Sequence, residues 1–165
     1  GGLKVAWGEA TEDMVYDFLA AHIYYRGVND RVFVQSARSH SWMATEMVGF
    51  LKGSSQSADA AVDSDSLGFV GHDADLDALA ALFGLSWHAL PFPANSTTPG
   101  SALRLDLVDE GKSVQASIVY QQFNSDNPPM RTVPATWNNF GKSTVSVADL
   151  EKWMAGRIVQ DCVPK

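Results

Sequence analysis

The 165-residue sequence has few cations, a single cysteine and no long apolar run, and these shortages exclude several classes of protein. Twelve Lys and Arg residues are outnumbered by nineteen Asp and Glu, and the net charge is −7. Nonspecific binding to nucleic acid requires a basic stripe that neutralises phosphates, so this charge argues against it. No apolar stretch approaches the roughly 20 residues of a membrane-spanning helix. A small anionic ligand remains possible, because a few cations can converge in one pocket.

The single cysteine, Cys162, lies near the end of the sequence. It is either an incidental reduced thiol or, in an exported protein, the partner of a cysteine on another chain. The first residues, GGLKVAWGEATEDM, begin with neither an initiator methionine nor the basic stretch of a signal peptide. We therefore expect a processed or truncated product whose first residues say little about targeting.

The hydrophobic pattern predicts helices and strands in the mixed order of an α/β fold. Helices are expected over residues 11–26, 37–52, 74–83 and 147–159. Strands are expected over residues 32–34 and 67–70, followed by a hairpin of residues 103–107 and 113–123. The apolar run at 67–70 shows no alternation, as is typical of a strand covered on both faces.

The junction Gly71-His72-Asp73, between a predicted strand and a predicted helix, is the main candidate site. Ligands of open α/β sheets bind beyond the carboxyl ends of the strands. A helix N-terminus there offers free N–H groups that favour phosphate, and Gly71 lets backbone or ligand approach closely. His72 can donate a hydrogen bond to a phosphate oxygen, and Asp73 can protonate a departing alkoxide.

Two other interpretations of this junction remain open. Asp73 can simply cap the helix, with Asp75 and Asp77 complementing the helix dipole. Alternatively, the imidazole and carboxylates of HDAD can ligate Zn²⁺ or Mn²⁺, as in a metal-dependent HD-type phosphohydrolase. None of the remaining histidines shows ligand spacing: His22, His40 and His88. His22 adjoins the apolar stripe of the first helix and is expected to be structural.

An ordered set of motifs resembles the C-terminal half of the histidine acid phosphatases, especially the bacterial phytase and glucose-1-phosphatase branch. FVGHDADLDALAALFGLSWHALPFPANSTTPGSALRLDL is followed by VQASIVYQQF. In that family a strand ends in Gly-His-Asp, and a helix, a Trp…Leu-Pro loop, an Asn-x-x-Pro-Pro-Gly stretch and a strand pair follow. SARSH…EMV and SVADLEKWMAGRIVQDC also resemble family helices, so the resemblance covers nearly the whole chain.

The resemblance implies that residues 1–165 form the C-terminal half of a phosphoglycerate-mutase-like, histidine phosphatase α/β domain. It implies hydrolysis of phosphomonoesters through a phosphohistidine, without a cofactor or metal. Asp73 would donate a proton to the leaving group and His72 would bind the phosphate, while His40 and Ala74 fall near substrate-facing positions. The family's nucleophilic histidine lies in an RHGxRxP motif, which this sequence lacks. We therefore expect the N-terminal half, with the nucleophile, on a separate chain.

The resemblance has further consequences for partners and substrate. Cys162 resembles a terminal family cysteine, which implies an interchain disulfide in a secreted or periplasmic protein. Phytases tend to have Asn where this chain has Asp75, and an extra carboxylate would repel phytate. Asn95-Ser96-Thr97 is a glycosylation sequon, expected in an exposed loop. A non-catalytic, phosphatase-like ligand-binding module remains an alternative.

Overall fold

The computed structural model describes residues 11–54, 65–121 and 129–164. Within these ranges the helices are α1 (Glu12–Asn29), α2 (Phe33–Leu51), α3 (Asp73–Phe83) and α4 (Val147–Ala155). The strands are β1 (Leu85–Ser86), β2 (Ala102–Val108), β3 (Ser113–Gln121), β4 (Met130–Pro134), β5 (Thr136–Trp137) and β6 (Thr144–Ser146). This mixture of helices and antiparallel sheets confirms the predicted α/β class.

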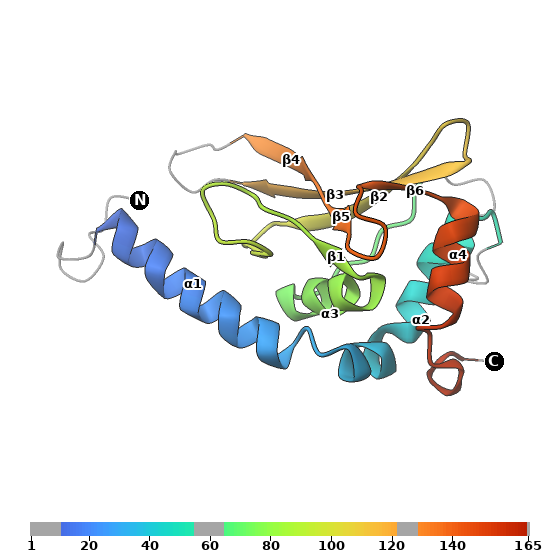
Figure 1. Cartoon of the computed structure of the whole chain (residues 1–165), viewed down its shortest axis with the longest axis horizontal. Helices are drawn as coiled ribbons and strands as arrows, with labels where there is room; N and C mark the ends of the chain where they lie inside the picture. Colours follow the sequence, from blue (N-terminus) through green and yellow to red (C-terminus); the bar gives the residue numbers. More distant parts are fainter. Residues whose placement is uncertain (1–10, 55–64, 122–128, 165) are drawn as a thin grey trace.

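The larger sheet is antiparallel and is built around β3. Strand β3 pairs with β2 along one side and with β4 and β6 along the other. In Figure 1 this sheet forms the upper layer, α3 lies beneath it, and α2 and α4 lie at one end. Strands β1 and β5 form a separate two-stranded sheet. Helix α1 leads away from the other helices, toward the end opposite α4 (Figure 1).

The predicted hairpin of β2 and β3 is confirmed, and its side-chain pattern explains why it forms. Val114, Ala116, Ile118 and Tyr120 occupy alternate positions of β3, and all four are buried. Because side chains alternate between the faces of a strand, these four residues share one face, which faces the core. The turn places Asp109, Glu110 and Gly111 at positive φ.

The core joins α3 to the sheet and to α4. The C-terminal half of α3 is buried, and Phe83 packs edge-on against Trp137 with ring centroids 5.9 Å apart. Leu150 and Met154 of α4 are also buried in this core. The position of α3 is therefore fixed by apolar packing at its C-terminal end, which leaves its N-terminal end at the surface.

The boundary between α1 and α2 differs from the prediction. The sequence predicts that the first helix ends near Gly27 and that residues 32–34 form a strand, but α1 continues to Asn29 and α2 begins at Phe33. No described strand lies beside residues 32–34, and an isolated strand of three residues has no partner for its backbone. Helix formation instead satisfies the backbone locally.

The prediction of a buried strand at residues 67–70 is also wrong, because the structure of this chain has no strand there. These residues lie outside every described helix and strand, and Val70 is fully exposed. A strand needs a neighbour to pair its N–H and C=O groups, and no described strand pairs with this segment. By contrast, β4 and β5 form at residues 130–137, where the sequence analysis predicts neither a helix nor a strand.

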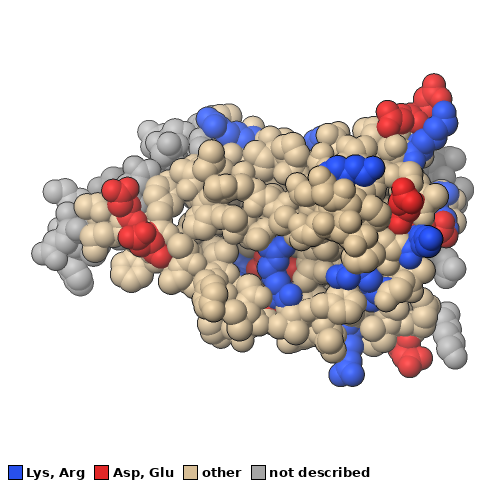
Figure 2. All heavy atoms as spheres, viewed as in Figure 1, with Lys and Arg blue, Asp and Glu red and all other residues tan. Residues whose placement is uncertain are grey.

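Helix α1 presents large apolar side chains to solvent. Phe18 and Tyr24 are 73% and 76% exposed, and Tyr25 and Val28 are also exposed. Figure 2 shows that this face is mostly uncharged near α1, apart from acidic side chains toward its N-terminal end. Among the described residues, no helix is both long enough and apolar enough to cross a membrane.

We expect residues 67–70 to exchange their amide hydrogens much faster than β3 does. β3 is hydrogen-bonded on both sides, whereas residues 67–70 lie outside the sheet. Hydrogen–deuterium exchange of the 165-residue chain, read by mass spectrometry of its peptides, checks this. Protection of residues 67–70 equal to that of β3 would contradict the description of this segment as unpaired.

Candidate functional site

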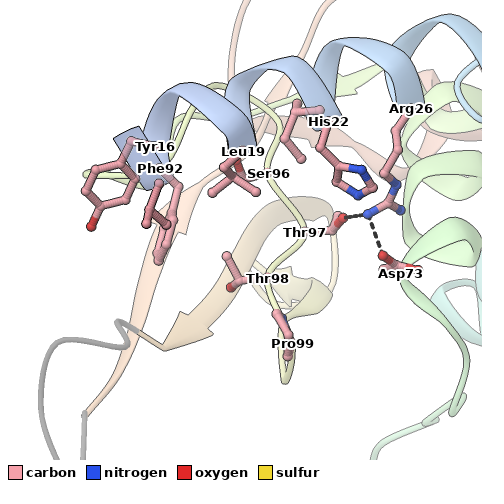
Figure 3. Close-up of a pocket in the computed structure, with 12 residues that line it drawn as sticks. Tyr16, Leu19, His22, Arg26, Asp73, Phe92, Ser96, Thr97, Thr98 and Pro99 are labelled. Atoms are coloured by element: carbon pink, nitrogen blue, oxygen red, sulfur yellow. Dashed lines mark hydrogen bonds and ion pairs between the residues drawn. The ribbon is translucent and has the colours of Figure 1, made fainter. Parts of the chain in front are cut away.

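A cavity of about 610 Å³ lies between α1, the loop of residues 92–99 and the start of α3. Asp73, the first residue of α3, opens into it at one end (Figure 3). The lining residues are Val15, Tyr16, Leu19, His22, Ile23, Arg26, Asp73, Phe92, Ser96, Thr97, Thr98 and Pro99. The structure therefore places one of the two predicted catalytic residues in a concave site.

The Arg26 side chain joins the three segments that form the polar end of this cavity. Arg26 is only 5% exposed, and its Nη1 donates to Asp73 Oδ2 at 2.6 Å and to Thr97 Oγ1 at 2.7 Å. Its Nη2 lies 2.6 Å from Asp77 Oδ2, and its Nε lies 3.5 Å from Asp30. A guanidinium group suits this position because its five N–H donors can bind several oxygens at once.

Asp77 carries a buried charge one turn behind Asp73. Its side chain is 3% exposed, and burial raises its pKa to about 6, although the nearby cations Arg26 and Arg31 act to lower it. The Arg31 guanidinium donates to Leu85 O at 2.6 Å and lies over the Trp87 ring, 5.0 Å from its centroid. Burial likewise lowers the pKa of Arg31. Asp77 and Arg31 thus lie in a poorly solvated space next to Arg26, which lines the cavity.

The cap of α3 differs from the expected one. His72, rather than Asp73, is the N-cap residue, and the Asp75 carboxylate accepts from the His72 backbone N–H at 2.5 Å. This bond, followed by the bond from His40, lowers the pKa of Asp75. A Cβ at Gly71 would lie 2.7 Å from Asp75 Oδ2. The group that approaches Gly71 closely is therefore Asp75, and not a ligand as the sequence suggested.

The other predicted site residues lie at the edge of this arrangement or beyond it. The His72 side chain is 84% exposed and contacts Asp73 through Nδ1, but it does not line the cavity. His40 Nε2 lies 3.0 Å from Asp75 Oδ1, so His40 positions that carboxylate and does not face the cavity. Ala74 is half-buried, and its backbone N–H donates to Asp73 Oδ1 at 2.9 Å. The expected convergence of these residues on one pocket is not observed in this chain.

Two residues that the sequence analysis did not select, His22 and Arg26, line the cavity beside Asp73. Their separation of four residues was a usable signal, because residues i and i+4 of a helix lie on the same face. His22 was expected to be structural because it adjoins an apolar stripe. That stripe instead lines a cavity, so His22 is accessible from it (Figure 3).

The loop that carries Thr97 is held by side-chain bonds, which corrects the expectation of an exposed sequon. Asn95 Oδ1 accepts from the Trp87 backbone N–H at 3.0 Å, and the Trp87 indole N–H donates to Ser96 O at 2.9 Å. Ser96 and Thr97 are buried. Asn95 adopts a positive φ of 62°. Ser96 and Thr97 thus line the cavity wall, whereas Asn95, the acceptor residue of the sequon, is half-buried.

Cys162 is exposed and free, in a 3-10 turn at Gln160–Cys162. Within the described ranges, no group of three His, Cys, Asp or Glu side chains is placed to hold a metal ion. The residues of the metal interpretation, His72, Asp73 and Asp75, therefore do not form such a group in the described structure.

The fold is similar to that of a bacterial phytase. The crystal structure of the phytase from Klebsiella sp ASR1 matches with a TM-score of 0.74 at 16% sequence identity. The match covers 98% of this chain but 43% of the phytase chain. No family model matches this sequence, and no curated protein matches it. The likeness shows the fold, and the chain spans less than half the length of that phytase, as expected for a half domain.

We predict that Asp77→Asn flattens the dependence of stability on pH between about pH 4 and pH 7. The raised pKa means that the folded state binds a proton which the unfolded state has released. Stability from this group is therefore greatest below pH 4 and is lost as the pH rises through about 6. The loss is at most about 3 kcal/mol for a shift of this size. Urea unfolding at several pH values measures it.

Asp17→Asn is the matched control, because Asp17 is an exposed carboxylate on α1. It should keep the pH slope of the parent chain. An Asp77→Asn variant with an unchanged slope would show that Asp77 is ionised throughout this range, and that the ion pair with Arg26 outweighs burial.

Proposed function

We propose that this chain is part of an acid phosphatase that hydrolyses phosphomonoesters through a phosphohistidine intermediate. The observation that carries the proposal is the position of Asp73. Its carboxylate opens into a cavity of about 610 Å³ beside a buried guanidinium and an accessible imidazole, in a fold similar to that of a phytase. A proton donor, a phosphate-binding cation and room for an alcohol group thus share one site.

In the proposed reaction, a histidine of the partner chain attacks phosphorus and forms a P–N bond. The P–O bond to the alcohol breaks, and the Asp73 carboxyl group gives its proton to the departing oxygen. Water then attacks phosphorus and passes a proton to the Asp73 carboxylate, while the P–N bond breaks and inorganic phosphate and the free histidine are released. Asp73 ends the cycle as it began, so one carboxyl group serves both half-reactions.

Arg26 has a defined part in this cycle. In the chain without phosphate, its Nη1 bonds both Asp73 and Thr97. A phosphate anion offers oxygens to the same donor, and charge-assisted bonds between guanidinium and phosphate are strong. Phosphate binding therefore draws Arg26 away from Asp73, and the released carboxyl group can hold the proton that it later donates. His72, in contact with Asp73, binds the phosphate from the solvent side.

The proposed partner is the N-terminal half of the same enzyme on a separate chain. A groove of about 540 Å³ supports this, because it runs between residues 65–69, α2 and β2. Within the described residues, β2 pairs only with β3 and residues 67–70 pair with no strand. A chain that supplies strands there would complete the sheet and bring the nucleophile to the tip of α3. Secretion or export to the periplasm, and a disulfide from Cys162 to this partner, belong to the same proposal.

A second candidate is a non-catalytic module that binds phosphorylated ligands. The exposure of His72, and the absence of an RHGxRxP motif from the sequence, favour it. Both candidates bind phosphate at Arg26, but only the first turns over a phosphomonoester once the partner is present. Hydrolysis of 4-nitrophenyl phosphate at about pH 5 by the assembly isolated from its native source distinguishes them.

In that assembly, we expect Asp73→Asn to lower kcat/KM for an alkyl phosphate by roughly 10²–10⁴-fold, the usual contribution of a general acid. The same variant should lower kcat/KM for 4-nitrophenyl phosphate far less, because nitrophenolate departs without a proton and kcat/KM does not include the later hydrolysis of the phosphohistidine. Steady-state kinetics with both substrates measures the split. Glu110→Gln, at an exposed carboxylate in the turn between β2 and β3 that lines neither the cavity nor the groove, is the control and should retain both values of kcat/KM. Equal losses of kcat/KM on the two substrates would show that Asp73 is not the proton donor to the leaving group.

For Cys162, we expect native material to migrate above 17.8 kDa without reductant and to release a 17.8 kDa chain when reduced. Non-reducing and reducing electrophoresis make the comparison, and mass spectrometry identifies the second chain. Cys162→Ser should abolish the shift. A free thiol in native, assembled material would contradict the proposed disulfide.

A further inference from the structure

The charged side chains that line the cavity lie at one end only. His22, Arg26, Asp73 and Thr97 gather at that end, whereas Tyr16 and Phe92 lie at the other (Figure 3). Val15 and Leu19 extend the apolar wall along α1. A ligand that fills this space must therefore combine a compact anionic group with an apolar body.

We propose that the cavity selects monoesters of aromatic or other apolar alcohols, with the phosphoryl group at Arg26 and the alcohol group against Tyr16 and Phe92. This inference deepens the proposed function and rests on it for the position of the phosphoryl group. It adds a class of substrate, which the phosphatase fold alone does not specify.

The apolar end is built from rings held in fixed positions. Tyr16 packs edge-on against Phe92 with centroids 6.1 Å apart, and Phe92 packs in the same manner on Tyr120, also at 6.1 Å. The Tyr120 hydroxyl donates to Leu90 O at 3.1 Å, which anchors the series to the loop. A wall that is ordered before the ligand arrives costs little conformational entropy on binding, and aromatic rings favour edge-on or offset contact with another ring.

Charge argues against a polyphosphorylated ligand such as an inositol polyphosphate. Among the described lining residues, only Arg26 and His22 can carry positive charge. Arg26 already lies 2.6 Å from both Asp73 and Asp77, so little net positive charge remains for a second or third phosphate. Asp75, which the sequence suggested as the repelling group, does not line the cavity. We therefore attribute the exclusion of polyphosphorylated ligands to the shortage of cations in the cavity.

The test measures binding of non-hydrolysable probes to the 165-residue chain by isothermal titration calorimetry. The probes are methylphosphonate, benzylphosphonate and myo-inositol hexakissulfate. We expect benzylphosphonate to bind at least tenfold more tightly than methylphosphonate, because burial of its ring adds apolar contact. The hexakissulfate should bind no more tightly than methylphosphonate. A smaller preference for the benzyl probe, tighter binding of the hexakissulfate, or no binding of benzylphosphonate would overturn the inference.

Two tyrosines of α1 provide a matched pair of variants. Tyr16→Ala removes a ring from the cavity wall and should reduce the benzyl preference to less than threefold. Tyr24→Ala removes a ring that is 76% exposed and outside the cavity, and should keep the full preference. Tyr16→Phe retains the ring and should also keep it. If circular dichroism shows that Tyr16→Ala is unfolded, Val15→Ala at a half-exposed wall position decides instead, with at least a twofold loss expected.

The outcomes separate this inference from the proposed function, because binding needs no nucleophile. Selective binding of benzylphosphonate, without turnover by the native assembly, would contradict the proposed phosphatase activity and support the selective site. Turnover by the assembly without any benzyl preference would contradict the proposed substrate class and support the phosphatase activity. The absence of both turnover and a benzyl preference would contradict both proposals.

Discussion

The contact on which the rest of the site depends is the buried guanidinium of Arg26. It connects α1 to Asp73 and Asp77 of α3, and to Thr97 of the neighbouring loop. Without it, the buried carboxyl group of Asp77 would lose its ion-pair partner, and the charged form would have little compensation for its lost hydration. The same cation is the one that a phosphate would meet at the polar end of the cavity. The Arg26 side chain therefore stabilises the contact with Asp73, and in the proposed function phosphate binding to the same side chain would break that contact.

The second constraint is that surfaces of the described ranges are not covered by other residues of those ranges. Residues 67–70 are unpaired and Val70 is fully exposed, while α1 presents Phe18 and Tyr24 to solvent. Exposed apolar patches of this kind mark interaction surfaces in folded proteins. The match to 43% of a phytase chain agrees with this view, because a half domain exposes the interface to its other half. The uncovered segment of residues 67–70 leads into α3, whose first residue lines the cavity of the proposed site.

Sequence reasoning succeeded where structure is determined locally. The hairpin, the final helix and the position of α3 follow from periodicity and turn residues within a few positions. It failed at residues 67–70, because apolar composition predicts a strand only when a neighbour exists to pair with it. Arg26 escaped notice for a related reason: its partners Asp73 and Thr97 are 47 and 71 residues away. Pairs at such separation are set by the tertiary fold and leave no local pattern.

The central claim is that this chain supplies the proton donor, while another chain supplies the nucleophile. The most direct measurement is to mix the native assembly with ³²P-labelled aryl phosphate, quench at alkaline pH within milliseconds, and separate the chains. Phosphohistidine survives such a quench, so the label marks the chain whose histidine attacked. The account predicts label on a partner that carries an Arg-His-Gly sequence and none on the 165-residue chain. Label on His22 or His72 of this chain would contradict it.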